Sequence, residues 1–180
     1  MGTDKAMLEI QGQPLIQRIS QLLREVFDKV IVVSDKEDRY KFLGLPIYAD
    51  IRKNCGPLGG IHSAFVNSQA DSLFVLACDT PFVSKELVEY ICEFESPADI
   101  KVPEMENRIH PLCGLYSRRI LQDIEMRLKS NQLSVQSLIE SVKSRVIPIT
   151  SELPFNRSDL LANFNSQKDF ERLVRLPESH

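Results

Sequence analysis

Short apolar runs alternate with amphipathic segments along most of this 180-residue chain. Apolar runs predict strands at residues 30–33, 47–49, 73–77, 100–102, 112–116 and 146–149. Apolar residues at helical spacing predict helices at residues 14–26, 61–66, 84–91, 120–128, 135–142 and 167–174. Strands that alternate with helices are typical of an α/β fold, in which helices cover both faces of a mostly parallel sheet. The pattern therefore predicts a three-layer α/β protein.

Two runs refine the predicted sheet. The run at 73–77 is the most apolar, and we expect it at the centre of the sheet. Pro148 lies inside the run at 146–149 and cannot donate a ladder hydrogen bond, which predicts an edge strand there. No repeat, low-complexity tract or linker interrupts the pattern, so we expect residues 1–180 to form a single domain.

Composition narrows the class of protein. The chain is 43% hydrophobic and 26% charged, as is ordinary for a globular protein, and its net charge of -3 argues against a broad nucleic-acid-binding surface. A phosphate-bearing small molecule stays compatible with this charge, because it needs only a few local Lys or Arg residues. No apolar run is long enough to span a membrane and the start lacks the features of a signal peptide. We therefore expect a cytoplasmic protein without nucleic-acid or membrane partners.

Asp79 is the first candidate for chemistry. It follows the run at 73–77, so we expect it at the carboxyl edge of the sheet, where open α/β folds bind ligands. Mg²⁺ takes one or two carboxylates together with substrate phosphate oxygens, so a lone Asp at that edge suits a metal anchor. An Asp that caps the turn before Pro81 explains the same position equally well.

A glycine-rich stretch at residues 54–60 is the second candidate. Its three glycines and one proline predict a loop whose backbone can approach a ligand closely and which leads into a helix N-terminus, a place that favours anions. A plain connecting turn is the alternative. Lys5 is the third candidate, because a compact ammonium group suits phosphate, although a lone terminal lysine is usually solvated.

Other polar side chains have weaker grounds. Five cations are candidate phosphate contacts, although each on its own is typical of surface charge: Arg52, Lys53, Arg108, Arg118 and Arg119. His110 lies beside Pro111 at the start of a predicted strand, where a substrate pocket would open. His62 is better explained as a structural histidine with satisfied hydrogen bonds.

Five short motifs, taken in chain order, resemble those of the MobA family. They are Met1-Gly2-Thr3-Asp4-Lys5 followed by Leu8, Gly12, Pro14 and Leu15; Gly56-Pro57-Leu58-Gly59-Gly60; Cys78-Asp79-Thr80-Pro81; His110-Pro111-Leu112 followed by Leu115-Tyr116; and Asn163-Phe164-Asn165-Ser166. Each motif is short, but five in the same order over nearly the whole chain are specific. The resemblance implies a Rossmann-like nucleotidyltransferase fold.

The resemblance also implies an activity, the transfer of GMP from GTP to molybdopterin with release of pyrophosphate. Asp79 would bind Mg²⁺ and Lys5 would contact the GTP phosphates, and these two would be the catalytic residues. Asp50 would lie near the nucleotide, and Ser34 stands where the family often has Asn. The guanine would be bordered by Gly56, Pro57, Leu58, Gly59 and Gly60. Asn163 and Asn165 would lie on the pterin side or near the metal.

The partners implied are the small-molecule substrates GTP and molybdopterin, with transient contact to cofactor-biosynthesis or acceptor proteins. One departure concerns the start: family members open with a strand and an LAGGxSxRMG loop, and this sequence begins at what resembles the final Met-Gly of that loop. We therefore expect further residues upstream in the native chain. Three alternatives stay open: a cytidylyltransferase acting on the same pterin, a sugar-phosphate nucleotidyltransferase, and a non-catalytic nucleotide- or pterin-binding protein.

Overall fold

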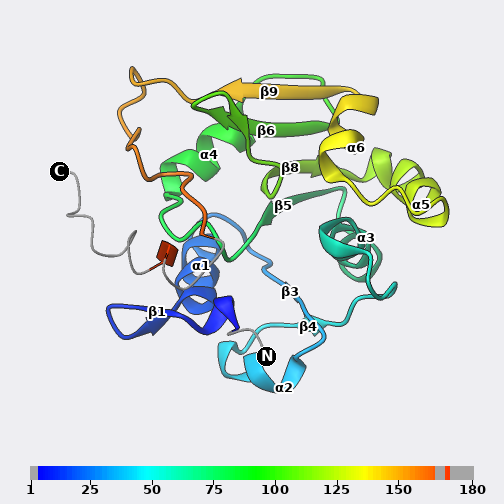
Figure 1. Ribbon diagram of the computed structural model, residues 1–180, viewed down its shortest axis with the longest axis horizontal. Helices are drawn as coiled ribbons and strands as arrows, with labels where there is room; N and C mark the ends of the chain where they lie inside the picture. The colour runs from blue at the N-terminus through cyan, green and yellow to red at the C-terminus, as the bar shows by residue number, and fades with distance from the viewer. Residues whose placement is uncertain (1–3, 165–168, 171–180) are drawn as a thin grey trace.

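A computed structural model describes residues 4–164 and 169–170, and it has three layers (Figure 1). Its longer helices are α1 (Leu15–Arg24), α3 (Gly56–Ser68), α4 (Lys85–Glu93), α5 (Leu121–Lys129) and α6 (Val135–Ser141). Figure 1 shows α1 and α4 on one side of the main sheet and α3, α5 and α6 on the other. The predicted α/β three-layer fold is confirmed. The helix predicted at 167–174 lies almost wholly outside the described residues.

The main sheet has five strands in the described part of the chain: β5 (Ser72–Leu76), β8 (Cys113–Ser117), β6 (Ile100–Met105), β7 (Arg108–Ile109) and β9 (Ser144–Pro148). Strand β8 lies between β5 and β6 and runs antiparallel to both, whereas β9 runs parallel to β6. Strands β5, β6 and β9 therefore point the same way, and β8 and the short β7 are reversed. Within the described residues β9 pairs with β6 alone, so Pro148 does mark an edge strand.

The place of β5 corrects one expectation. In the described residues β5 pairs only with β8, so it lies at one end of the five-stranded sheet and not at its centre. Its side chains alternate between two cores: Leu73 and Val75 pack with the cluster under α3, α5 and α6, and Phe74 and Leu76 pack with the cluster under α4. An apolar run indicates that both faces of a strand are covered, but it does not indicate how many edges of that strand are paired.

Two smaller pairs of strands lie outside the main sheet. Strands β3 (Val32–Val33) and β4 (Ile47–Tyr48) are parallel to each other, and β1 (Glu9–Ile10) and β2 (Gln13–Pro14) form a hairpin. The shorter helical segments are η1 (Lys5–Met7), α2 (Glu37–Tyr40), η2 (Lys41–Leu43) and η3 (Arg118–Ile120). Val32 and Ile47 share an apolar cluster with Tyr40 and Cys78, so the β3–β4 pair packs beside the residue that precedes Asp79.

Side chains fix both ends of α4. The Ser84 hydroxyl accepts a hydrogen bond from the Leu87 amide at 3.3 Å, which is the N-cap expected from the sequence. At the other end the buried Lys101 Nζ donates to the carbonyl oxygens of Cys92 at 2.7 Å and Phe94 at 3.0 Å. A cation there satisfies carbonyl groups that the helix itself leaves free. None of the helices in the described residues has the length and apolar character needed to cross a bilayer.

Candidate active site

Asp79 lies just beyond the end of β5. The Ala77 amide donates to the Leu112 carbonyl oxygen at 2.9 Å, and the Thr80 hydroxyl closes the turn by donating to the Ala77 carbonyl at 3.0 Å. Asp79 is therefore held at the carboxyl end of a strand, as the sequence predicted. Burial raises the pKa of its carboxyl group, while a backbone hydrogen bond and the positive charges of Lys5 and Arg108 act in the opposite direction.

Lys5 reaches the same place from the N-terminal end. Its Nζ donates a hydrogen bond to the carbonyl oxygen of Phe164 at 2.9 Å and lies 5.4 Å from the centre of the Phe164 ring. The Phe164 amide in turn donates to the carbonyl oxygen of Asp79 at 3.2 Å. Three segments far apart in the sequence therefore meet at one point, and Phe164 joins the two residues that the sequence analysis singled out as catalytic.

Phe164 itself was not predicted as a site residue. It is fully buried and packs with Leu15, Ile10 and Phe170, so its backbone is anchored by its ring. The only signal in the sequence is its place inside the Asn-Phe-Asn-Ser motif. Asn163 precedes it and is half-buried, and Asn165 lies outside the described residues, so the assignment of both to the pterin side or the metal stays a prediction.

A second group of predicted residues gathers at the ends of β3 and β4. The Ser34 amide donates to the Tyr48 carbonyl oxygen at 2.8 Å, which continues the parallel pairing by one step. The Asp50 amide donates to Asp35 Oδ1 at 3.2 Å, and Lys53 forms an ion pair with that same carboxylate. The carboxyl ends of both strands thus lie at one edge, and Ser34 and Asp50 are near each other there.

The predicted loop at 54–60 is wrong from Gly56 onward. Helix α3 begins at Gly56, so Gly56 to Gly60 form its first turn and a half instead of a loop. Pro57 at the start of a helix loses no hydrogen bond, because the first amides have no partner inside the helix. Gly59 has a packing reason, since a Cβ there would lie 2.8 Å from the Cys55 Cβ. Gly59 therefore allows close packing at the helix start, which propensity alone does not predict.

Asp50 faces this helix start. Its Oδ1 is buried and has no hydrogen-bond partner in the described residues, and a Cβ added to Gly60 would lie 3.9 Å from it. Burial raises the pKa of this carboxyl group; the Asp35 charge adds to the rise and Lys53 opposes it. A buried acceptor without a partner costs free energy, so the arrangement suits a ligand that brings a donor to it.

Three of the other candidate cations are engaged in contacts away from Asp79. Arg118 donates to the Ala70 carbonyl oxygen at 2.6 Å and to the carbonyl of Phe65, so it stabilises the C-terminal end of α3. Arg119 pairs with Asp99 at 2.6 Å and is exposed at the surface. Arg118 and Arg119 are therefore structural or surface residues, and Lys53 is held by Asp35.

Arg108 differs from these cations. It follows a two-residue turn between β6 and β7, in which Glu106 and Asn107 both have positive φ, as tight hairpin turns of type I′ require. It is exposed, and its charge acts on Asp79 and on His110. His110 is buried, and burial together with Arg108 lowers its pKa to about 4, so its imidazole is neutral at pH 7.

His62 only partly fits the expectation of a structural histidine. It is buried in α3, but its Nδ1 has no partner in the part of the chain that the structure describes. Burial lowers its pKa, although Glu125 lies 3.8 Å from its Nε2. Within the described residues, no hydrogen bond or ion pair joins His62 to Asp79 or Asp50.

The site has the donor chemistry for one kind of metal. Among the described residues no three His, Cys, Asp or Glu side chains gather closely enough to hold an ion on their own. Asp79 is a single, partly buried carboxylate flanked by cations. This set fits Mg²⁺ that is shared with substrate phosphate oxygens, and it does not fit an all-protein cage.

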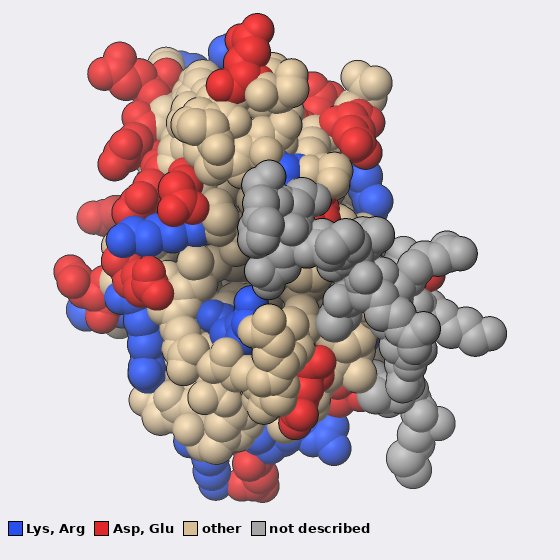
Figure 2. Space-filling model, turned by 90° about the vertical axis from the view of Figure 1, so that its left-hand side faces the viewer, with Lys and Arg blue, Asp and Glu red and all other residues tan. Residues whose placement is uncertain are grey.

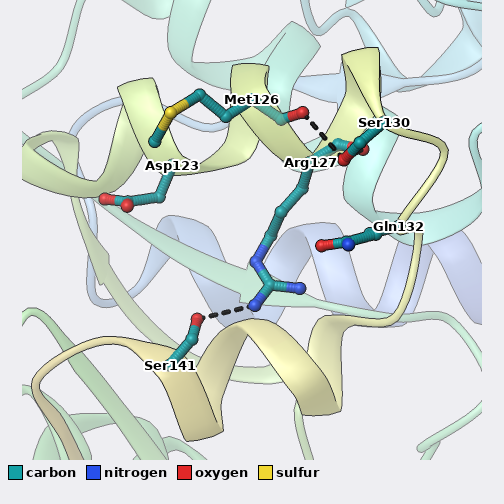
Figure 3. Close-up of a pocket in the computed structure, with 6 residues that line it drawn as sticks. All are labelled: Asp123, Met126, Arg127, Ser130, Gln132 and Ser141. Carbon is teal, nitrogen blue, oxygen red and sulfur yellow. Dashed lines mark hydrogen bonds between the residues drawn. The ribbon is translucent and has the colours of Figure 1, made fainter.

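A pocket and the distribution of surface charge say less about the function. A shallow pocket of about 250 Å³ lies between α5 and α6, where Arg127 donates to the Ser141 hydroxyl, and it contains none of the predicted site residues (Figure 3). Figure 2 shows acidic and basic side chains interspersed over the face that carries α1, without one basic surface on the visible part. This distribution agrees with a site for a small molecule.

Known proteins resemble the chain over most of its length. The family model described as "MobA-like NTP transferase domain" matches residues 1–146. An Aquifex aeolicus protein named "Probable molybdenum cofactor guanylyltransferase" is 29% identical over 99% of this chain and 86% of its own length. A solved Aquifex aeolicus structure gives a TM-score of 0.78 at 29% identity, covering 93% of this chain and 87% of that one. The Archaeoglobus fulgidus molybdopterin-guanine dinucleotide biosynthesis protein A has the same fold, with a TM-score of 0.77 at 22% identity over 96% of this chain and 90% of that one.

Proposed function

Because this chain belongs to the MobA-like NTP transferase family and is a nucleotidyltransferase, we propose that it transfers GMP from GTP to molybdopterin. The observation that carries the proposal is the convergence of Lys5, Asp79 and Phe164 at the end of β5. It gives a carboxylate for a metal and an ammonium group for phosphate, side by side. The relative from Aquifex aeolicus supports the choice of substrates, since its name is that of a guanylyltransferase.

In the proposed reaction an oxygen of the molybdopterin phosphate attacks the α-phosphorus of GTP. The new phosphorus–oxygen bond forms while the bond from the α-phosphorus to the bridging oxygen breaks, and pyrophosphate leaves with that electron pair. The attacking phosphate is ionised near neutral pH, so no general base is needed. The work of the protein is to align the two phosphates and to offset their charge.

Each residue of the proposed site has its own task. Lys5 contacts the GTP phosphates as a point charge, at the position that the Phe164 carbonyl gives it. Asp79 would hold Mg²⁺, which when bound supplies further positive charge to the phosphates. Arg108 adds positive charge on the same side, towards the acceptor phosphate. Asn163 and Asn165 are assigned to the pterin side.

The guanine is proposed to lie between Asp50 and the first turn of α3, with Ser34 at the nucleotide as well. Guanine carries N–H donors at N1 and N2 of its pairing edge, and the unpartnered Oδ1 of Asp50 accepts such donors. Cytosine has acceptors at the matching positions, N3 and O2, and only its N4 amino group could donate, so it lacks the two adjacent donors of guanine. The same chemistry favours GTP over CTP. The partners are these small molecules, in the cytoplasm, with transient contact to proteins that supply or receive the pterin.

The test is pyrophosphate release with molybdopterin and GTP, CTP or ATP, for the wild-type chain and the Asp79→Ala variant. We expect GTP to be used far better than CTP or ATP, and Asp79→Ala to lose transfer while its circular dichroism spectrum stays unchanged. Comparable kcat/KM for GTP and CTP would assign the chain to the cytidylyltransferases. Binding of GTP without any turnover would favour a non-catalytic binding protein, and wild-type transfer by Asp79→Ala would refute the metal assignment.

A further inference from the structure

Asp4, the residue before Lys5, has a side chain that accepts hydrogen bonds from several other side chains. Its side chain is only 10% exposed. The Tyr40 hydroxyl donates to it at 2.9 Å, Arg39 at 2.8 Å and Lys36 at 3.1 Å. All three donors come from α2 or from the residue just before it, so Asp4 joins the N-terminal segment to that helix.

Asp4 also shapes the segment that carries Lys5. It is the N-cap of η1, and its Oδ1 accepts a hydrogen bond from the Ala6 amide at 3.3 Å. A helix of three residues is too short to hold its own conformation, so its position depends on such outside contacts. Lys5 leaves η1 in the direction of Phe164 and Asp79, and its backbone is fixed by Asp4.

The electrostatics of this group are compatible with a neighbouring triphosphate. Burial alone would raise the pKa of the Asp4 carboxyl, but hydrogen bonds from Arg39, Lys36 and Tyr40 outweigh burial and lower it to about 2. Asp4 is therefore ionised at any working pH. Lys36 and Arg39 together carry more charge than Asp4, so the group as a whole does not repel phosphate.

The group also connects the two halves of the site. Helix α2 follows the end of β3, where Ser34 lies, and Tyr40 is buried in the apolar cluster that contains Val32 and Cys78. A bond from Asp4 to Tyr40 thus ties the phosphate side of the site to the nucleotide side. A simple surface ion pair, such as Lys41 with Asp38, makes no such connection.

We propose that Asp4 is a positioning residue of this transferase, which acts by fixing to α2 the η1 segment that carries Lys5 and never touches the substrate itself. The inference rests on the proposed function of Lys5 as a phosphate contact. It predicts that removing the Asp4 carboxylate lowers activity only while Lys5 is present. Asp4 acts through Lys5, so it has nothing left to position once the Lys5 side chain is removed.

The experiment is a double-mutant cycle with Asp4→Ala, Lys5→Ala and the double variant, measured in the full chain by kcat/KM for GTP and by calorimetric GTP titration. Asp4→Ala is expected to lower kcat/KM about 10- to 100-fold, the cost of displacing a catalytic group by about 1 Å. In the Lys5→Ala background the same change should alter kcat/KM by no more than about 2-fold. Asp38→Ala, which removes an exposed ion pair on the same helix, is the control and should behave as wild type.

The outcomes separate this inference from the proposed function. If Lys5→Ala keeps wild-type kcat/KM, the proposed role of Lys5 fails, and the inference fails with it. If Lys5→Ala is impaired but Asp4→Ala is equally damaging with and without Lys5, only the inference fails. Tyr40→Phe gives a milder second cycle, should Asp4→Ala not fold: it deletes one donor and keeps the charges. It too should lower kcat/KM only when Lys5 is present, and an equal loss in both backgrounds would overturn the proposal.

Discussion

The ammonium group of Lys5 donates a hydrogen bond to the carbonyl oxygen of Phe164, 159 residues further along the chain, at 2.9 Å. The same residue's amide donates to the carbonyl of Asp79. Phe164 therefore belongs to the proposed phosphate side of the site, and its buried ring fixes the backbone groups that contact the two catalytic candidates.

Phe164→Ala is expected to damage both stability and nucleotide binding. The ring is fully buried against Leu15 and Phe170, and deleting such a side chain costs about 3–5 kcal/mol of unfolding free energy. Because the ring anchors the carbonyl that holds Lys5, GTP affinity should fall even at temperatures where the variant is folded. Urea unfolding and GTP titration measure the two effects. Phe42→Ala, at a position 52% exposed, should change neither, and unaltered GTP affinity in Phe164→Ala would contradict the anchoring role.

Asp50→Asn is expected to stabilise the fold at neutral pH and to weaken the use of GTP. Folding raises the pKa of the Asp50 carboxyl above its ordinary 3.8, chiefly through burial, so its charged form is disfavoured in the native state. The cost is fully present above the folded pKa and disappears as the pH falls below 3.8. The melting temperatures of variant and wild type should therefore differ at pH 7 and converge near pH 3. A variant that is less stable than wild type at pH 7 would refute the assignment of a buried, unpaired carboxylate.

Gly59→Ala and Gly60→Ala should have opposite consequences, although the residues are adjacent in α3. A Cβ at Gly59 would meet the Cys55 Cβ at 2.8 Å, and such overpacking costs about 1–3 kcal/mol. At Gly60 the nearest neighbour is Asp50 Oδ1 at 3.9 Å, so alanine fits and favours the helix by about 0.5–1 kcal/mol. Its methyl group would nevertheless stand beside the proposed guanine site. We expect Gly60→Ala to raise the melting temperature slightly and to raise KM for GTP; an unchanged KM would place the base elsewhere.

Arg108→Ala is expected to lower transfer about 10- to 100-fold, which is the cost of one charge-assisted hydrogen bond to a phosphate. Its effect should appear in the KM of the pterin acceptor more than in that of GTP, and Arg108→Lys should recover part of it. The surface residue Arg119 supplies the matched control, as Arg119→Ala. NMR titration gives an independent check, because removing Arg108 should raise the His110 pKa from about 4. A His110 pKa that does not move would mean that the two side chains are not close.

Much of the secondary structure followed from the sequence alone. Helix α1 behind Pro14, the Ser84 cap of α4 and the edge strand with Pro148 are confirmed, because each depends on contacts or backbone preferences within a few residues. The short motifs also gave the family, and they singled out Lys5 and Asp79. These are the features that local chemistry can determine.

Only the tertiary structure decided the rest. The end position of β5 and the reversal of β8 both depend on partners distant in the sequence. The role of Phe164 could not be predicted, since it acts through backbone groups that every residue possesses, and Asp4 is distinguished only by donors that α2 brings to it. Periodicity and propensity record the preferences of a segment and the covering of its faces. They contain no information on which distant backbone or side-chain group will complete its hydrogen bonds, and at this site those long-range hydrogen bonds set the geometry.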